Sequence, residues 1–184
     1  MSFILTAISN FILMMSKQEG ALKAVMFWML GSLAGAKWNN IVIPAFVFFV
    51  VFGLLWLHYR NLNLLLLGEE AAVTLGVNLQ QFRIQLILLV SLLTGVLVAV
   101  SGSIGFVGLI IPHIVRLIVG SNYKYVIPIS ALIGGIFLVW ADAFARIIIA
   151  PPQEMPIGII TAFCGGPFFI WLLRRNNYSF GEGD

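Results

Sequence analysis

Residues 84–112 read IQLILLVSLLTGVLVAVSGSIGFVGLIIP and contain no charged side chain. A membrane-spanning helix needs about 20 predominantly apolar residues, so this stretch is too long for one helix without tilt and too short for two full ones. A break is expected at the small residues from Ser101 to Gly105, because they have weak helix propensity and glycine tolerates tight turns. We therefore predict one helix over residues 83–100 and a shorter one over residues 105–119, the second containing Pro112.

The rest of the chain also has the composition of a membrane protein. Of its 184 residues 61% are hydrophobic and 9% are charged, whereas soluble domains have about 45–50% and 25%. Further uncharged runs of spanning length cover residues 41–59, 125–141 and 155–173. We predict an all-α, polytopic membrane helix bundle in which residues 1–184 form a single transmembrane domain, with about six membrane helices plus short interfacial helices.

Two apolar runs near the amino end are shorter. Residues 3–15 lack the charged flank and the small-residue cleavage site of a signal peptide. Residues 24–36 are interrupted by Gly31 and Gly35 and flanked by lysines, which is typical of an interfacial or re-entrant helix. The distribution of Lys and Arg over the loops favours a cytoplasmic carboxyl terminus and a cytoplasmic loop over residues 60–83.

The ionisable residues argue against chemistry inside the membrane. His58 and His113 have no second ligand at metal-binding spacing, so packing or bonding to the backbone is the favoured role of His113 and no metal site is predicted. There is no Walker-type phosphate loop, so the chain is not expected to bind ATP or another cofactor itself. The net charge of +3 is scattered, which disfavours nucleic-acid binding. The single cysteine, Cys164, lies in an apolar run and is expected to be buried.

The loop over residues 60–83 contains a candidate docking element. Helix-forming residues lie between two glycines, and acidic residues at the first turn suit the helix dipole. We predict a short helix capped at both ends whose small alanines let a partner approach closely; an ordinary solvated connector is the alternative. The candidate residues are Gly68, Glu69, Glu70, Ala72, Leu75 and Gly76.

Two further patterns have competing interpretations. Asp142 and Arg146 are four residues apart, which predicts an ion pair on one helix face near the outer membrane surface; Arg146 could instead pair with an acidic partner protein. Gly102, Gly105 and Gly108 recur every third residue, which we interpret as a small-residue face for close helix packing rather than a phosphate-binding loop.

Several long motifs together resemble the FecCD-type permeases, the membrane subunits of bacterial ABC importers for ferric siderophores, haem and vitamin B12. The motifs are LGEEAAVTLGV at 67–77, SGSIGFVGLIIPHIVR at 101–116, ADAFAR at 141–146, EMPIGIITA at 154–162 and GPFFI at 166–170. Residues 27–35, FWMLGSLAG, are similar to a periplasmic helix segment of the same family.

The resemblance implies a multi-pass subunit of the bacterial inner membrane that performs no reaction on its cargo. Its implied partners are a second permease subunit, as a homo- or heterodimer, two cytoplasmic ATPase subunits that bind ATP and Mg²⁺, and a periplasmic substrate-binding protein. The loop over residues 60–83 matches the family's ATPase-coupling loop. Arg146 matches an arginine that docks the binding protein.

The resemblance covers the carboxyl-terminal portion of such permeases, so the amino-terminal helices are expected on a separate polypeptide or to have been lost, as in a non-transporting remnant. An iron(III) chelate, either siderophore or haem, is the expected cargo, with vitamin B12 as the alternative. Ser9 and Asn10 are the polar candidates for the substrate pathway, although interhelical hydrogen bonding explains them equally well. An intramembrane enzyme is the rival of a different class, and the sparse ionisable residues disfavour it.

Overall fold

The computed structural model describes residues 25, 27–148 and 155–177, and every regular element in these ranges is helical. Residues 27–30 form a short helical segment before α3. The predicted all-α fold is confirmed. The helices are α3 (Trp38–Leu57), α4 (Tyr59–Leu65), α5 (Glu69–Thr74), α6 (Leu79–Ser101), α7 (Val107–Val119), α8 (Tyr123–Ile148) and α9 (Ile157–Asn177).

Four of the described helices are long and apolar enough to cross a membrane: α3, α6, α8 and residues Ile157–Arg174 of α9. α7 is apolar but shorter, as expected from the break between residues 101 and 105. The uncharged run 125–141 lies within α8, which continues through the predicted pair of Asp142 and Arg146 to Ile148. The run over residues 3–15, with Ser9 and Asn10, lies outside the described residues.

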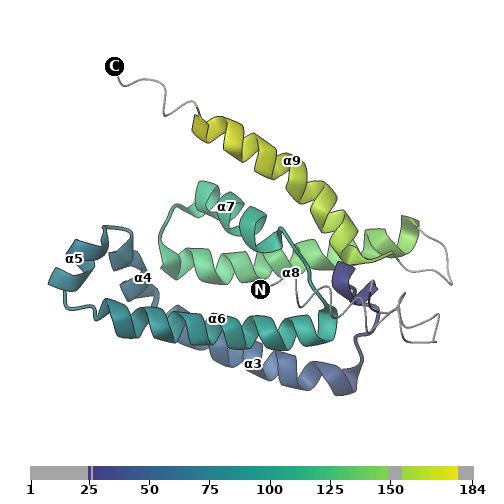
Figure 1. Ribbon diagram of the computed structural model, residues 1–184, viewed down its shortest axis with the longest axis horizontal. Coiled ribbons are helices and arrows are strands. Elements are labelled where there is room, and N and C mark those ends of the chain that lie inside the picture. The colour runs from purple at the N-terminus through teal and green to yellow at the C-terminus, as the bar shows by residue number, and fades with distance from the viewer. Residues whose placement is uncertain (1–24, 26, 149–154, 178–184) are drawn as a thin grey trace, which may run out of the picture.

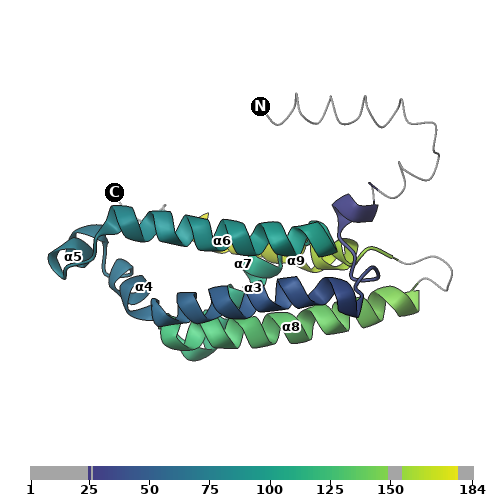
Figure 2. The same cartoon turned by 90° about the horizontal axis from the view of Figure 1, so that it is seen from below.

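The helices form two antiparallel pairs that lie against each other. Figure 1 and Figure 2 show α3 beside α6 and α7 beside α8, with α3 also along α8 and α9 crossing α7 and α8 obliquely. α4 and α5 project at one end of the bundle. The last turn of α8 and the first turn of α9 lie at the opposite end.

The buried core is small and lies mainly between α7 and α8. Ile111, Val115 and Val126 are buried together, and they are surrounded by partly buried Val107, Val119, Ile129, Ile133 and Phe137. Among the described residues of α6, by contrast, only Phe82 is buried. An apolar helix with so little burial in its own chain needs lipid or another protein around it.

At the end opposite α5, three segments meet at glycines without space for a side chain. A Cβ on Gly102 would overlap the carbonyl oxygen of Trp28, and one on Gly158 would overlap that of Leu30. A Cβ on Gly31 would lie 2.7 Å from the carbonyl oxygen of Ser103. The backbone of Ser32 also donates a hydrogen bond to the carbonyl of Ser101 (2.8 Å). This glycine junction of Gly31, Gly102 and Gly158 fastens the start of the described chain to the α6–α7 connection and to α9.

The prediction that Gly102, Gly105 and Gly108 share one helical face is wrong. Gly102 and Gly105 lie in the connection between α6 and α7, and only Gly108 is inside α7 with Pro112. Gly102 has a φ of +69°, which a glycine adopts without strain and which ends α6. Neither Gly105 nor Gly108 has an atom within 4 Å of a built Cβ, so close packing is confined to Gly102.

The expectation that Cys164 is buried is also wrong. Its thiol is free and exposed on α9. Together with Phe144, Ile148 and Phe163 it borders an apolar groove of about 390 Å³ between the carboxyl end of α8 and α9. The apolar run around Cys164 therefore reflects the surroundings of a membrane helix rather than burial within the chain.

Candidate functional site

α5 forms the short helix that the loop sequence predicts. It begins after Gly68, with a φ of +104°, and is followed by Gly76, with a φ of +89°. Both values lie in the left-handed region, where a side chain other than glycine is strained. Hydrogen bonds from Gly76 N to Val73 O (2.9 Å) and from Val77 N to Ala72 O (3.0 Å) close the carboxyl end of the helix. The two glycines thus set the direction in which the chain enters and leaves α5.

The two faces of α5 differ in exposure. Ala72 is completely buried, because this face lies against α4 and α6. The prediction that Ala72 lets a partner approach is therefore wrong: its small size serves packing within the chain. Val73 and Leu75 are 55% and 61% exposed. We call these two side chains and the neighbouring Gly76 the α5 tip. Exposed apolar residues at a loop end are typical of a protein-binding surface.

Charged residues hold α5 against the start of α6. Glu69 in the first turn of α5 forms an ion pair with Arg83 of α6. Both side chains are more than half exposed, so this pair orients the helix more than it stabilises the fold. Glu70 is also in the first turn, where a carboxylate complements the helix dipole, and its carbonyl accepts a hydrogen bond from the Thr74 hydroxyl (2.9 Å).

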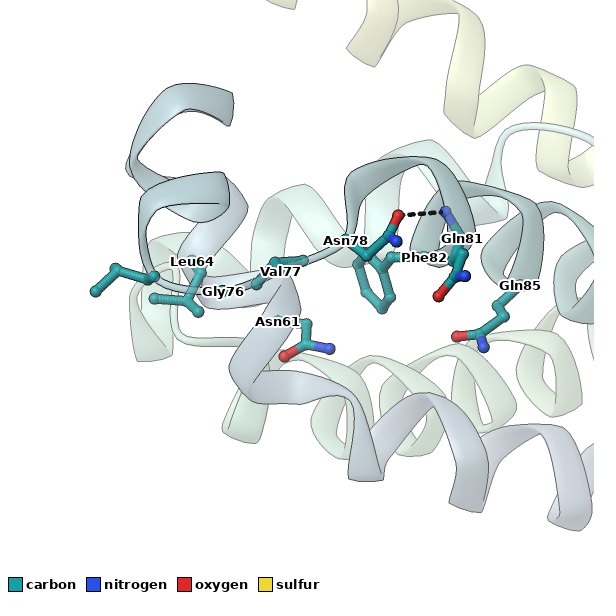
Figure 3. Close-up of a pocket in the computed structure, with 9 residues that line it drawn as sticks. Asn61, Leu64, Gly76, Val77, Asn78, Gln81, Phe82 and Gln85 are labelled. Carbon is teal, nitrogen blue, oxygen red and sulfur yellow. Dashed lines mark hydrogen bonds between the residues drawn. The ribbon is translucent and has the colours of Figure 1, made fainter.

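A groove of about 250 Å³ opens beside the α5 tip. Figure 3 shows its residues, which come from α4, from the turn after α5 and from α6. Asn78 caps α6 by accepting a hydrogen bond from Gln81 N (3.2 Å), and Phe82 is buried and stacks on His58 of the α3–α4 junction. The groove is lined by Asn61, Leu64, Leu75, Gly76, Val77, Asn78, Gln81, Phe82 and Gln85.

The groove offers uncharged amides and an apolar rim, without an acid, a base or a metal ligand among its residues. Such a surface can bind another protein and is not equipped for catalysis. Sequence reasoning identified Leu75 and Gly76 but missed the amides of Asn61, Asn78, Gln81 and Gln85. The one available signal was Asn78 shortly before the uncharged stretch that begins at Ile84, because asparagine is a favoured helix N-cap residue.

The start of α8 is fastened to α4 by side-chain amides that sequence reasoning also missed. Asn63 Nδ2 donates to Asn122 Oδ1 (2.9 Å), and Asn63 Oδ1 accepts from the backbone N–H of Tyr123 (2.8 Å). Asn122 Oδ1 additionally accepts from Lys124 N (3.0 Å). Trp56 at the end of α3 donates its indole N–H to the Lys124 carbonyl (3.1 Å). Beside them, a hydrogen bond from Arg60 and its positive charge lower the pKa of Tyr59.

Asp142 and Arg146 form the predicted intrahelical pair in the last two turns of α8. Arg146 Nε lies 2.8 Å from Asp142 Oδ2, and the guanidinium side chain is 50% exposed. The pair explains why α8 continues past the first charged residue, since each charge offsets the desolvation of the other. It lies at the end of the bundle opposite α5 (Figure 1).

Both described histidines contact other residues of this chain. His58 Nδ1 lies 2.7 Å from the Leu54 carbonyl, and the His113 ring makes an edge contact with Phe168, with 5.6 Å between ring centroids. Within the described ranges, no group of three His, Cys, Asp or Glu residues could hold a metal ion. Gly68, Glu69, Glu70, Leu75 and Gly76 thus come together at one end of the bundle, and Arg146 lies at the other.

The sequence matches the FecCD transport family over residues 1–175. The chain belongs to this family. One FecCD relative is the cobalamin import system permease protein BtuC of Halobacterium salinarum. It is 43% identical to this chain, and the match covers 93% of this chain and 45% of the relative. The hemin transport system permease protein HmuU of Yersinia pestis is 42% identical, with 84% and 46% covered. The Fe(3+) dicitrate transport system permease protein FecD of Escherichia coli is 42% identical, with 89% and 51% covered.

The fold is similar to that of a solved transporter. A structure described as an inward-facing conformation of a metal-chelate-type ABC transporter matches with a TM-score of 0.84 and 35% identity, covering 95% of this chain and 56% of that one. The chain spans about half the length of the curated relatives it matches. The FecCD family is one of transport permeases, and the α-helical membrane bundle agrees with that class.

Proposed function

We propose that this chain is a membrane-spanning permease subunit of an ATP-driven importer for an iron(III) chelate, either a ferric siderophore or haem. The observation that carries the proposal is α5: in a FecCD chain, a short helix between two left-handed glycines presents an apolar tip at one end of the bundle. Vitamin B12 is the second candidate cargo, because a cobalamin import permease is among the relatives.

In this proposal each end of the bundle binds a different partner. The α5 tip and its groove dock on a cytoplasmic ATPase subunit, which binds ATP and Mg²⁺, while this chain binds no cofactor. The end with Arg146 docks a periplasmic substrate-binding protein. A second permease subunit completes the translocation pathway, and the carboxyl terminus lies in the cytoplasm. The subunit belongs to the bacterial inner membrane.

Reconstitution tests the proposal. The chain, in the membrane complex that it forms in its host, is placed in vesicles with the ATPase and the binding protein, and uptake of ferric siderophore, haem and cobalamin is compared. We expect ATP-dependent uptake of an iron chelate and ATP hydrolysis stimulated by the loaded binding protein. Uptake of cobalamin alone would support the second candidate. Partner binding without any uptake would indicate a non-transporting remnant and would contradict the proposal.

The proposed orientation predicts the accessibility of Glu70. A cysteine placed at this exposed position, in a Cys164→Ser background, should react with a membrane-impermeant thiol reagent only after the cells are opened. A cysteine at exposed Ile147, in the last turn of α8 at the opposite end of the bundle, should react in intact cells whose outer membrane is permeable. The reverse pattern of labelling would overturn the topology.

Arg146 is predicted to dock the binding protein through a charge-assisted hydrogen bond. We expect Arg146→Glu to weaken binding of that protein at least about tenfold, the equivalent of about 1.4 kcal/mol, because a repulsive carboxylate replaces the guanidinium. A reciprocal Glu→Arg change in the binding protein should restore part of the affinity. The effect should shrink as salt is raised, because the half-exposed guanidinium is screened.

Arg146→Glu also breaks the pair with Asp142, so thermal unfolding in detergent is measured beside binding. Asp142→Asn is the matched control, because it removes the ion pair but keeps the guanidinium. Normal binding by Arg146→Glu at low salt, combined with a loss of thermal stability, would restrict Arg146 to its intrahelical role.

A further inference from the structure

The amide contacts fasten α4 to the start of α8, and α8 runs from the α5 end of the bundle to the Arg146 end. α4 leads directly into α5, and Asn63 of α4 binds both the side chain of Asn122 and the backbone of Tyr123. We propose that Asn63 is a positioning residue that transmits movement of the α4–α5 unit to α8. This inference rests on the proposed function, because it assigns a route between its two docking surfaces.

Asn63 acts as a helix cap supplied by a different helix. The first N–H groups of an α-helix have no partner within the helix. In α8 the N–H of Lys124 binds Asn122 Oδ1, which is a local cap, whereas the N–H of Tyr123 binds Asn63 Oδ1. Separation of α4 from α8 would leave the Tyr123 donor unpaired in a partly buried place, so the two helix ends should move together.

α8 is suited to carry such a movement across the bundle. It is a continuous helix of 26 residues, about 39 Å long at 1.5 Å per residue. Its first turn holds the contacts with Asn63 and Trp56, and its last two turns hold Asp142 and Arg146. A shift at the α4 end therefore reaches the proposed binding-protein surface through one element. The indole of Trp56 adds a second contact to the same turn, from the helix that precedes α4.

Two variants compare loss of the Asn63 contacts with their retention. Asn63→Leu has a similar volume but removes both hydrogen bonds to the α8 start. Asn122→Asp keeps an oxygen that can accept from Asn63 Nδ2 and from Lys124 N, so it is the conservative control. In vesicles containing the ATPase and the binding protein, we expect Asn63→Leu to lower uptake per ATP hydrolysed at least about fivefold, equivalent to about 1 kcal/mol. Asn122→Asp should remain close to the unsubstituted chain.

A label at each end of the route supplies a readout that a merely structural role would not change. In a Cys164→Ser background, one cysteine replaces exposed Leu66 after α4 and another replaces exposed Ile147 in the last turn of α8, and each carries a spin label. On ATP binding by the ATPase we expect both spectra to change in the unsubstituted chain. In Asn63→Leu, only the label at position 66 should respond.

Three outcomes would overturn the inference. A normal response at position 147 in Asn63→Leu would show that α8 moves without this contact. Loss of the response at both positions would show that Asn63 acts on folding or docking instead. Absence of a response at position 66 in the unsubstituted chain would contradict the proposed docking of α5, and the inference with it.

Discussion

Substitution of Gly102 by alanine is expected to lower the free energy of unfolding by about 2–5 kcal/mol. Two effects add at this position. The φ of +69° places an L-residue in the left-handed region, at a cost of about 1–2 kcal/mol. The new Cβ also overlaps the backbone carbonyl oxygen of Trp28 and lies 3.1 Å from Gly31 Cα. Overpacking of this kind costs about 1–3 kcal/mol, and backbone atoms cannot rotate away as a side chain could.

Gly105→Ala is the matched control in the same connection. Its Cβ would have no atom within 4 Å and its φ is not positive, so its stability should stay within about 0.5 kcal/mol of the unsubstituted chain. Thermal unfolding in detergent measures both variants, and a loss of 3 kcal/mol corresponds to a midpoint lower by at least about 6 °C. Equal midpoints for Gly102→Ala and Gly105→Ala would show that the glycine junction does not hold these segments together.

The glycine junction also shows what sequence reasoning could and could not reach. Residues 101–105 are correctly predicted to interrupt the helix, because weak helix propensity is a local property. The role of Gly102 depends on Trp28 and Gly31, which are about seventy residues earlier in the chain. No local pattern indicates which segment a glycine will meet. The three-residue spacing therefore suggested a shared face that does not exist.

The same distinction holds at the candidate site. The two glycines and the helix formers between them predict α5 well, because caps and propensities act over a few residues. Whether Ala72 faces a partner or the chain's own α4 and α6 depends on tertiary packing, and the structure buries it. Asn63 and Asn122 are 59 positions apart, so their contact was equally beyond reach. The pair of Asp142 and Arg146 at the end of α8 is predicted correctly, because a spacing of four residues is again a local property of one helix.

Gly76→Trp is expected to uncouple ATP hydrolysis from transport. Gly76 borders the groove beside Val77 and Asn78, and a Cβ at this position would have no atom of the chain within 4 Å. An indole attached to this open position would project from the α5 tip into the space that the ATPase is proposed to occupy. We expect uptake per ATP hydrolysed to fall at least about tenfold, equivalent to about 1.4 kcal/mol of lost coupling, with normal insertion into the membrane.

Gly76→Ala separates the bulk of the indole from strain in the backbone. Alanine, like tryptophan, is strained at a φ of +89°, but it adds only a methyl group. Gly76→Ala therefore keeps the backbone strain and does not block the proposed ATPase contact. If α5 docks on the ATPase, alanine should retain most of the coupling, and the ATPase should copurify with it but less well with Gly76→Trp. If both variants lose coupling equally, the conformation of the loop matters and the docking surface lies elsewhere. Unchanged coupling in Gly76→Trp would remove α5 from the interface altogether, because a partner seated on the α5 tip could not accommodate an indole in the contact.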